Sequence, residues 1–233
     1  MTRDSRLARF DHLPTLAPGL GILPPALAAL WPLLGDIPED FVLYGGTGLA
    51  LRLAHRTSED FDFFSPESFS PSDLLKSLAW LGRVTIDEWS PNNLRITTAR
   101  DIHLSFSGGM RLQCVAEPAI VEENGVVVAS TYDLAGTKAK AVLDRAEWKD
   151  YFDIATLLRH HLTLPEIIGY ATTIFDALFE FPAVVFLRSL AWFGDGTVPA
   201  LPEDMKRELE QAAARAAHEE IPVVEPYSTS ILP

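Results

Sequence analysis

The order of strand-like and helix-like segments predicts an α+β fold, in which a sheet-containing first part is followed by an all-helical second part. Short apolar or alternating segments, which are typical of strands, are confined to residues 41–128. From Thr131 onward, apolar residues recur at helical spacing instead. We therefore divide the chain into an α+β domain at 1–130 and a helical domain at 131–233.

The first part alternates helices with single strands. Pro24 and Pro25 mark a helix start, and Pro71 marks another. The apolar run at 41–44 predicts a buried strand, and the interleaved Phe and Asp residues at 60–64 predict a second one. The expected elements are a helix at 26–34, a strand at 41–44, a tight turn at 45–48, a helix at 49–54, a strand at 60–64 and a helix at 70–81.

The rest of the chain is first strand-rich and then helical. Strands are expected at 83–89, 93–98, 102–106 and 111–117. Asn124-Gly125 is a strong hairpin signal between the apolar pairs at 120–121 and 126–128. Helices are then expected at 133–146, 148–160, from Pro165, from Pro182 and at 202–218, with an irregular tail from residue 221.

Composition limits the classes of function. The chain has 233 residues, of which 48% are hydrophobic and 22% charged, the profile of a folded globular protein. Its formal net charge of −13 argues against a broad basic surface for long duplex DNA and favours a small-molecule donor. The sequence has no apolar stretch long enough to span a membrane. The single cysteine, Cys114, favours a reducing cytoplasmic setting.

Two short motifs suggest phosphate and metal chemistry. Gly45, Gly46 and Thr47 lie where a strand turns into a helix, and glycines there let phosphates approach the backbone amides. Strand alternation sends Asp60 and Asp62 to one face, where two carboxylates suit Mg²⁺ or Mn²⁺ bridging to substrate phosphates. Each motif alone is more often an ordinary turn or a solvated strand face. Their combination is much more specific.

These residues resemble a known family. The segments at 44–52 (YGGTGLALR) and 55–64 (HRTSEDFDFF) are similar to the AbiEii/AbiGii-type nucleotidyltransferase toxins, which belong to the DNA polymerase β-like nucleotidyltransferase superfamily. The resemblance covers about 41–158. It implies a nucleotidyltransferase-like mixed β-sheet with flanking helices, metal-binding acids at Asp60 and Asp62, and an NTP as donor.

A second group of charged residues lies in the helical part. Lys138 and Arg145 share one helical face, and Asp150 and Asp153 are three residues apart on the next helix. On their own these residues indicate a surface salt-bridge network between two helices. With the resemblance, Lys138 is a candidate to neutralise NTP phosphates, and Asp150 and Asp153 are candidates to orient it or to act as general base. The helical domain would then complete the active site.

Two arginines and one missing carboxylate bear on the site. Arg52 and Arg56 are candidate phosphate ligands near the glycine turn, and Arg56 is a better candidate than its neighbour His55 because it is always charged. Many superfamily members carry a third acid on a following strand, but the expected strand at 102–106 offers His103 and Ser105 on the site face. Asp101 is in phase with them at the strand's start. Because the third carboxylate is missing, a family member that has lost catalytic activity stays an alternative.

The predicted function is metal-dependent transfer of NMP from an NTP to a tRNA 3′ end or a protein side chain. By resemblance the protein is the toxin of a toxin–antitoxin or phage-defence pair, with a cognate antitoxin as partner. A tRNA acceptor would need a basic patch. The arginines available for it are Arg52, Arg56, Arg95, Arg100 and Arg111. Two alternatives use the same fold: a catalytically degenerate binding module and a metal-dependent phosphohydrolase.

Overall fold

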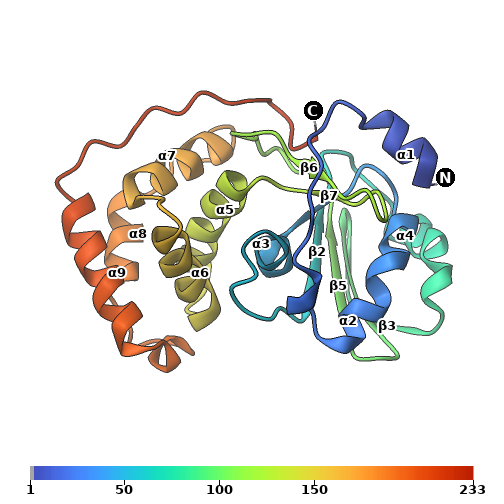
Figure 1. Ribbon diagram of the computed structural model, residues 1–233, viewed down its shortest axis with the longest axis horizontal. Coiled ribbons are helices and arrows are strands. Elements are labelled where there is room, and N and C mark those ends of the chain that lie inside the picture. Colours follow the sequence, from blue (N-terminus) through green and yellow to red (C-terminus); the bar gives the residue numbers. More distant parts are fainter. Residues whose placement is uncertain (1–2, 233) are drawn as a thin grey trace. The chain divides into compact units, whose positions relative to one another are not determined.

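The computed structural model describes residues 3–232 and contains a mixed β-sheet in the first part of the chain (Figure 1). The strands are β1 (Val42–Tyr44), β2 (Asp60–Phe64), β3 (Val84–Ser90), β4 (Asn93–Thr98), β5 (His103–Ser107), β6 (Ala119–Ile120) and β7 (Val127–Val128). They lie in the order β3-β4-β5-β2-β1-β7-β6. β2, which carries Asp60 and Asp62, pairs antiparallel with β1 and parallel with β5, so it lies inside the sheet.

The described helices agree in type and order with the expected ones, apart from an additional helix at the start. They are α1 (Arg3–Arg9), α2 (Pro25–Leu30), α3 (Gly45–Leu53), α4 (Pro71–Ser77), α5 (Thr131–Asp144), α6 (Trp148–Arg159), α7 (Leu164–Phe175), α8 (Ala183–Leu190) and α9 (Glu203–Ala216). The α7 start has a local cause, because Thr163 and Glu166 form a capping box around it. The tail after α9 is irregular, as expected.

One face of the sheet carries the main apolar core of the first part. Phe61 and Phe63 of β2 are almost fully buried there, together with Leu104 and Phe106 of the parallel neighbour β5. α2 and α4 contribute Leu27 and Leu74 to the same cluster. The alternate residues of β2 and β5 therefore point to the other face, and these include both predicted metal-binding acids.

The hairpin signal is confirmed in both its parts. β6 and β7 pair antiparallel, and Gly125 between them has a φ of 74°, which favours glycine. The side-chain oxygen of Asn124 accepts a hydrogen bond from the backbone of Val126 at 3.1 Å, while its amide donates to the carbonyl of Trp31 at 2.8 Å. Asn124 thus ties the turn to the segment after α2.

Two local expectations are wrong. The glycine turn at 45–48 is already helical, because α3 begins at Gly45 directly after β1. The segment at 111–117 is not a strand of the sheet. Its amides are bonded elsewhere: Gln113 donates to the carbonyl of Ile174 at 3.1 Å, and Val115 donates to the Asp133 carboxylate at 2.8 Å.

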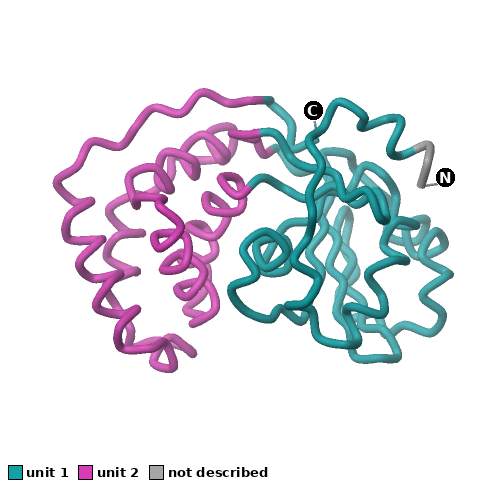
Figure 2. Tube along the Cα trace, in the orientation of Figure 1, with its two compact units in different colours: residues 1–111, 117–130, 228–233 teal, residues 112–116, 131–227 magenta. Residues whose placement is uncertain are grey.

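The chain forms two compact units (Figure 2). Unit 1 comprises Met1–Arg111, Glu117–Ser130 and Ser228–Pro233, and unit 2 comprises Leu112–Ala116 and Thr131–Tyr227. This grouping differs from a single cut at residue 130, because the short segment before β6 belongs to the helical unit and the last residues belong to the sheet unit. Within 3–232, no helix is long and apolar enough to cross a membrane.

Candidate active site

Gly45 lies in contact with one of the two site acids. Its φ is 68°, a left-handed conformation that costs an L-residue with a side chain roughly 1–2 kcal/mol. A Cβ atom at this position would lie only 2.0 Å from Oδ2 of Asp62. Two independent reasons therefore require glycine at the start of α3, and the Asp62 carboxylate packs directly over the Gly45 backbone.

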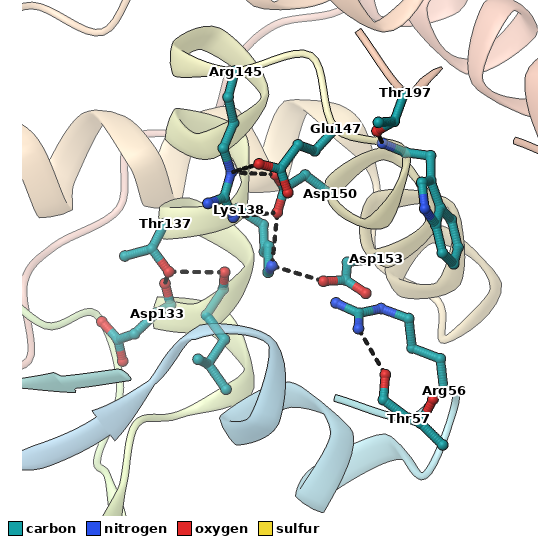
Figure 3. Close-up of polar contacts among 12 residues, drawn as sticks. Arg56, Thr57, Asp133, Thr137, Lys138, Arg145, Glu147, Asp150, Asp153 and Thr197 are labelled. Carbon is teal, nitrogen blue, oxygen red and sulfur yellow. Dashed lines mark hydrogen bonds and ion pairs between the residues drawn. The ribbon is translucent and has the colours of Figure 1, made fainter. Parts of the chain in front are cut away.

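Gly46 has a comparable role toward Arg56. A Cβ atom at position 46 would lie 2.9 Å from an Nη atom of Arg56 and 3.0 Å from Oγ of Ser58. The Arg56 guanidinium also donates to the carbonyl of Thr57 at 2.9 Å (Figure 3). The structure thus brings Arg56 to the first turn of α3, where the amides of a helix start favour anions.

Asp60 and Asp62 occupy the face of β2 that alternates with the core phenylalanines, as predicted. Asp60 is exposed, whereas Asp62 is half-buried. Oδ1 of Asp62 accepts a hydrogen bond of 2.6 Å from the hydroxyl of Ser105, its register partner on β5. Asp62 is therefore held by the Ser105 hydroxyl, and Asp60 is the more exposed of the two acids.

The Thr47 side chain is used within the chain, and its phosphate contact stays a prediction. Its side chain is fully buried, and its hydroxyl donates to the backbone carbonyl of Asp60. A buried hydroxyl that has already given its proton to a carbonyl is not available as a donor to a ligand. Thr47 instead connects the first turn of α3 to the start of β2, which fixes the glycines relative to the acids.

Arg52 is also used structurally. Its Nε donates to the carbonyl of Ala129 at 2.6 Å and its Nη2 to the carbonyl of Val128 at 3.0 Å. These bonds attach the end of α3 to the chain that leaves β7. They leave less of the guanidinium for an incoming phosphate, and its role in NTP binding stays a prediction.

The neighbouring strand β5 carries no third acid at the site. His103 is the register partner of Asp60, and Ser105 that of Asp62, as expected from the strand phase. Asp101 lies before the strand, in the turn after β4, with a φ of 61°. No group of three metal-ligating side chains is found in the part of the chain that the structure describes.

His103 belongs to a polar chain across the sheet. The Thr97 hydroxyl donates to the Asp87 carboxylate at 2.5 Å and lies 2.8 Å from Nδ1 of His103. Because a hydroxyl has one proton, Thr97 accepts from His103, and Nδ1 carries the imidazole proton. The strand face beside Asp60 and Asp62 therefore carries a chain of hydrogen-bonded polar side chains.

The second predicted group of residues comes together inside unit 2 (Figure 3). The Lys138 ammonium on α5 lies 2.8 Å from Oδ1 of Asp150 and 2.8 Å from Oδ2 of Asp153, both on α6. All three residues are buried, with exposed fractions of 5%, 0% and 0%. The salt-bridge network between two helices is thus present, but it lies in the interior and not on the surface.

Charge pairing in this cluster outweighs the cost of burial. Burial alone would lower the pKa of Lys138, but the nearby Asp153 and Asp150 raise it above its usual value. Burial would likewise raise the pKa of Asp150, but Lys138 and Arg145 hold it below its usual value. Arg145 donates to Asp150 at 2.8 Å. The lysine is therefore charged and held in place by both acids.

This geometry bears on the predicted roles of the cluster. Asp150 and Asp153 orient Lys138, as one of the two suggested roles requires. A general base needs a carboxylate within reach of the reacting hydroxyl, and both carboxylates here are buried against the ammonium. The orienting role fits the structure better, and the NTP contact of Lys138 stays a prediction.

Sequence reasoning missed two contacts at the acidic pair. The approach of Asp62 to Gly45 and the Ser105 hydrogen bond each join residues from different strands or helices. The phase of the expected strand at 102–106 did place Ser105 on the site face. It did not show which of the two acids the hydroxyl would reach, because that depends on the parallel register between β2 and β5.

Gly45→Ala is expected to destabilise the protein more than Gly82→Ala. Gly82 also has a positive φ of 71°, with a ψ of −135°, and a methyl group added there would have no atom within 4 Å, so it serves as a control for backbone strain without overlap. The additional cost at position 45 is the overpacking against Asp62, about 1–3 kcal/mol. Urea unfolding of both variants measures the difference. Equal losses would show that Asp62 moves away from the methyl group at no cost.

Comparison with known proteins agrees with this fold. The profile described as "Nucleotidyl transferase AbiEii toxin, Type IV TA system" matches residues 33–226. An uncharacterized protein of Aquifex aeolicus (strain VF5) is 35% identical over 133 residues, which are 54% of this chain and 61% of that protein. The chain therefore spans less than two thirds of the length of this curated relative.

Two solved structures were compared with the chain, and one of them shares its fold. MenT4, a nucleotidyltransferase toxin from Mycobacterium tuberculosis H37Rv, superposes with a TM-score of 0.54 at 14% identity, covering 94% of this chain and 91% of MenT4. The Thermotoga maritima CCA-adding enzyme complexed with tRNA reaches a TM-score of 0.36 at 12% identity, over 73% of this chain and 51% of the enzyme, which is too low to support an argument.

The fold is therefore α+β, a mixed sheet with flanking helices as the sequence predicted, and it is similar to the fold of MenT4. Because the family profile covers most of the chain, including both acids and the buried lysine cluster, the chain belongs to the AbiEii nucleotidyl transferase toxin family.

Proposed function

We propose that this protein transfers a nucleoside monophosphate from an NTP to an acceptor, with a divalent metal ion bound by Asp60 and Asp62. The observation that carries the proposal is the placement of these two carboxylates on one strand face, with one of them packed against the glycine start of α3. A phosphate-binding helix start and a pair of acids are then neighbours in the same unit. Membership of the AbiEii family supports this interpretation.

The residues present fit Mg²⁺ or Mn²⁺. Mg²⁺ in nucleotide-dependent enzymes is held by one or two protein carboxylates together with substrate phosphates and water, so a third acid is not required. Asp60 is exposed, and Asp62 is half-buried with a fixed orientation. When bound, the ion would neutralise phosphate charge and polarise oxygens at the reacting centre.

The chain's own residues would bind and orient the donor. Gly45 and Gly46 let the Asp62 carboxylate and the Arg56 guanidinium approach the first turn of α3, and Arg56 lies beside Gly46 as a charged donor for a phosphate at this helix start. In the reaction the acceptor oxygen forms a bond to the α-phosphorus while the bond to pyrophosphate breaks, and the acceptor proton is released. Orientation of donor and acceptor supplies a large part of such catalysis.

The acceptor and the biological setting are further parts of the proposal. A toxin role with a cognate antitoxin is supported by the family description. For the acceptor we propose a tRNA 3′ end or a protein side chain. Arg95 favours a phosphate-bearing acceptor, because it is exposed and is the register partner of Ser105 on the site face. The phage-defence setting, the cytoplasmic location and the completion of the site by unit 2 remain predictions.

Label transfer tests the proposed activity. The protein is incubated with each α-³²P-labelled NTP and Mg²⁺ in the presence of total RNA or total protein, and the labelled fraction is identified. We expect label in one fraction, with one preferred NTP, and none with the double variant Asp60→Ala/Asp62→Ala. Free NMP without a labelled acceptor would favour the phosphohydrolase instead. No turnover by the folded protein would favour the degenerate binding module.

A further inference from the structure

The Asp62 carboxylate is confined on two sides by groups from different elements. Its Oδ1 accepts the 2.6 Å hydrogen bond from the Ser105 hydroxyl on β5. Its Oδ2 lies so close to the start of α3 that a methyl group on Gly45 would overlap it, at 2.0 Å. The carboxylate therefore has little freedom to rotate. Asp60, on the same strand face, is exposed.

The direction of the hydrogen bond follows from the groups involved. An ionised carboxylate only accepts, so the Ser105 hydroxyl must donate. Hydrogen bonds to a charged acceptor are about twice as strong as those between neutral groups. Ser105 is the register partner of Asp62 in the parallel β2–β5 pair, so the strand pairing itself sets this contact.

We propose that Ser105 is a positioning residue for Asp62, which holds this carboxylate in the orientation that binds the divalent ion. The inference rests on the proposed function, because it assumes that Asp62 is a metal ligand. The proposal also accounts for the serine at the strand position where many superfamily members carry a third acid. A hydroxyl at position 105 orients the existing acids, whereas a third carboxylate there would add a negative charge beside Asp62.

A matched control is available on the same strand. Ser107 lies two residues further along β5, on the same face, and its hydroxyl bonds Asn93 at 3.1 Å and not an acid of the site. Ser105→Ala and Ser107→Ala each remove one half-buried hydroxyl that makes one side-chain hydrogen bond. The two variants differ in whether that bond goes to Asp62. Ser105→Thr keeps the hydroxyl and suits a strand.

Mn²⁺ binding, measured by electron paramagnetic resonance without nucleotide, tests the role independently of turnover. Substitution of groups that orient metal ligands typically costs about 10- to 100-fold in metal affinity, and we expect a loss in this range for Ser105→Ala. Ser107→Ala should bind Mn²⁺ as the unmodified protein does, and Ser105→Thr should recover most of the affinity. In the labelling assay, Ser105→Ala should lower kcat and leave the KM of the acceptor unchanged.

The outcomes distinguish the positioning role of Ser105 from the proposed function of the protein. Unaltered Mn²⁺ affinity in Ser105→Ala, or an equal loss in Ser107→Ala, would overturn the positioning role while the proposed function stands. If the unmodified protein bound no Mn²⁺ either alone or with a non-hydrolysable NTP analogue, the proposed function and the role of Ser105 would be overturned together. Thermal unfolding of both alanine variants is recorded alongside, and we expect similar midpoints because each loses one comparable hydrogen bond.

Discussion

Asp60→Ala and Asp62→Ala are each expected to lower nucleotidyl transfer by about a thousandfold or more, which corresponds to roughly 4 kcal/mol of lost transition-state stabilisation. Each substitution removes one of the two carboxylates that hold the proposed ion. The fold should survive, because neither side chain belongs to the apolar core on the other face of β2. Fewer clustered acids should, if anything, relieve repulsion in the metal-free protein.

Two further variants make this prediction specific. Glu59→Ala removes an exposed acid immediately before β2 and should leave transfer unchanged, which controls for the loss of local negative charge. Asp62→Asn keeps an acceptor for Ser105 and nearly the same shape but removes the ionic charge, so we expect it to be inactive. Transfer at the unmodified rate by Asp60→Ala or Asp62→Ala, in folded protein, would refute the metal assignment.

The strand phase of the acidic pair could be predicted from sequence because it depends on nearest neighbours. Phe61 and Phe63 alternate with Asp60 and Asp62, and the demand to bury both aromatic rings fixes which face the acids take. The same reasoning placed Ser105 on the site face. Local alternation therefore sufficed wherever one face of a strand is buried and the other is not.

Contacts that join distant segments were beyond that reasoning. Thr47 follows two glycines in a pattern that suggests phosphate binding. Its hydroxyl nevertheless donates a hydrogen bond to the backbone carbonyl of Asp60, thirteen positions along the chain. The segment at 111–117 has an apolar pattern typical of a strand, but its amides bond α7 and Asp133. Whether a polar group bonds a ligand or its own chain is decided by tertiary packing, which the local pattern does not contain.

The Lys138 cluster shows that the local sequence pattern also does not predict whether charged side chains are buried. Spacing predicted correctly that Lys138, Asp150 and Asp153 lie on facing sides of two helices. A run of charged residues is usually solvent-exposed, so sequence alone favoured a surface network. The structure buries the three side chains, and burial changes the energetics of each of them.

Lys138→Met is accordingly expected to destabilise unit 2 strongly, by roughly 3–5 kcal/mol, because it leaves two buried carboxylates without their shared ammonium. Asp150 would retain Arg145 as a partner, and Asp153 would lose its contact with Lys138. Lys140→Met is the matched control. It lies on the same helix and forms its ion pair with Asp144, four residues along on the surface, so its loss should cost well under about 1 kcal/mol.

Stability and nucleotide binding can be separated by removing the whole charged cluster. The triple variant Lys138→Met/Asp150→Asn/Asp153→Asn removes the buried ammonium together with both carboxylate charges and should recover part of the stability lost by Lys138→Met. Urea unfolding gives the stabilities, and NTP affinity is then measured on the triple variant where it is folded. Lost NTP affinity there would support the predicted phosphate contact of Lys138. Unchanged affinity would leave the buried cluster with a structural role, in which Asp150 and Asp153 join α6 to α5 through one lysine.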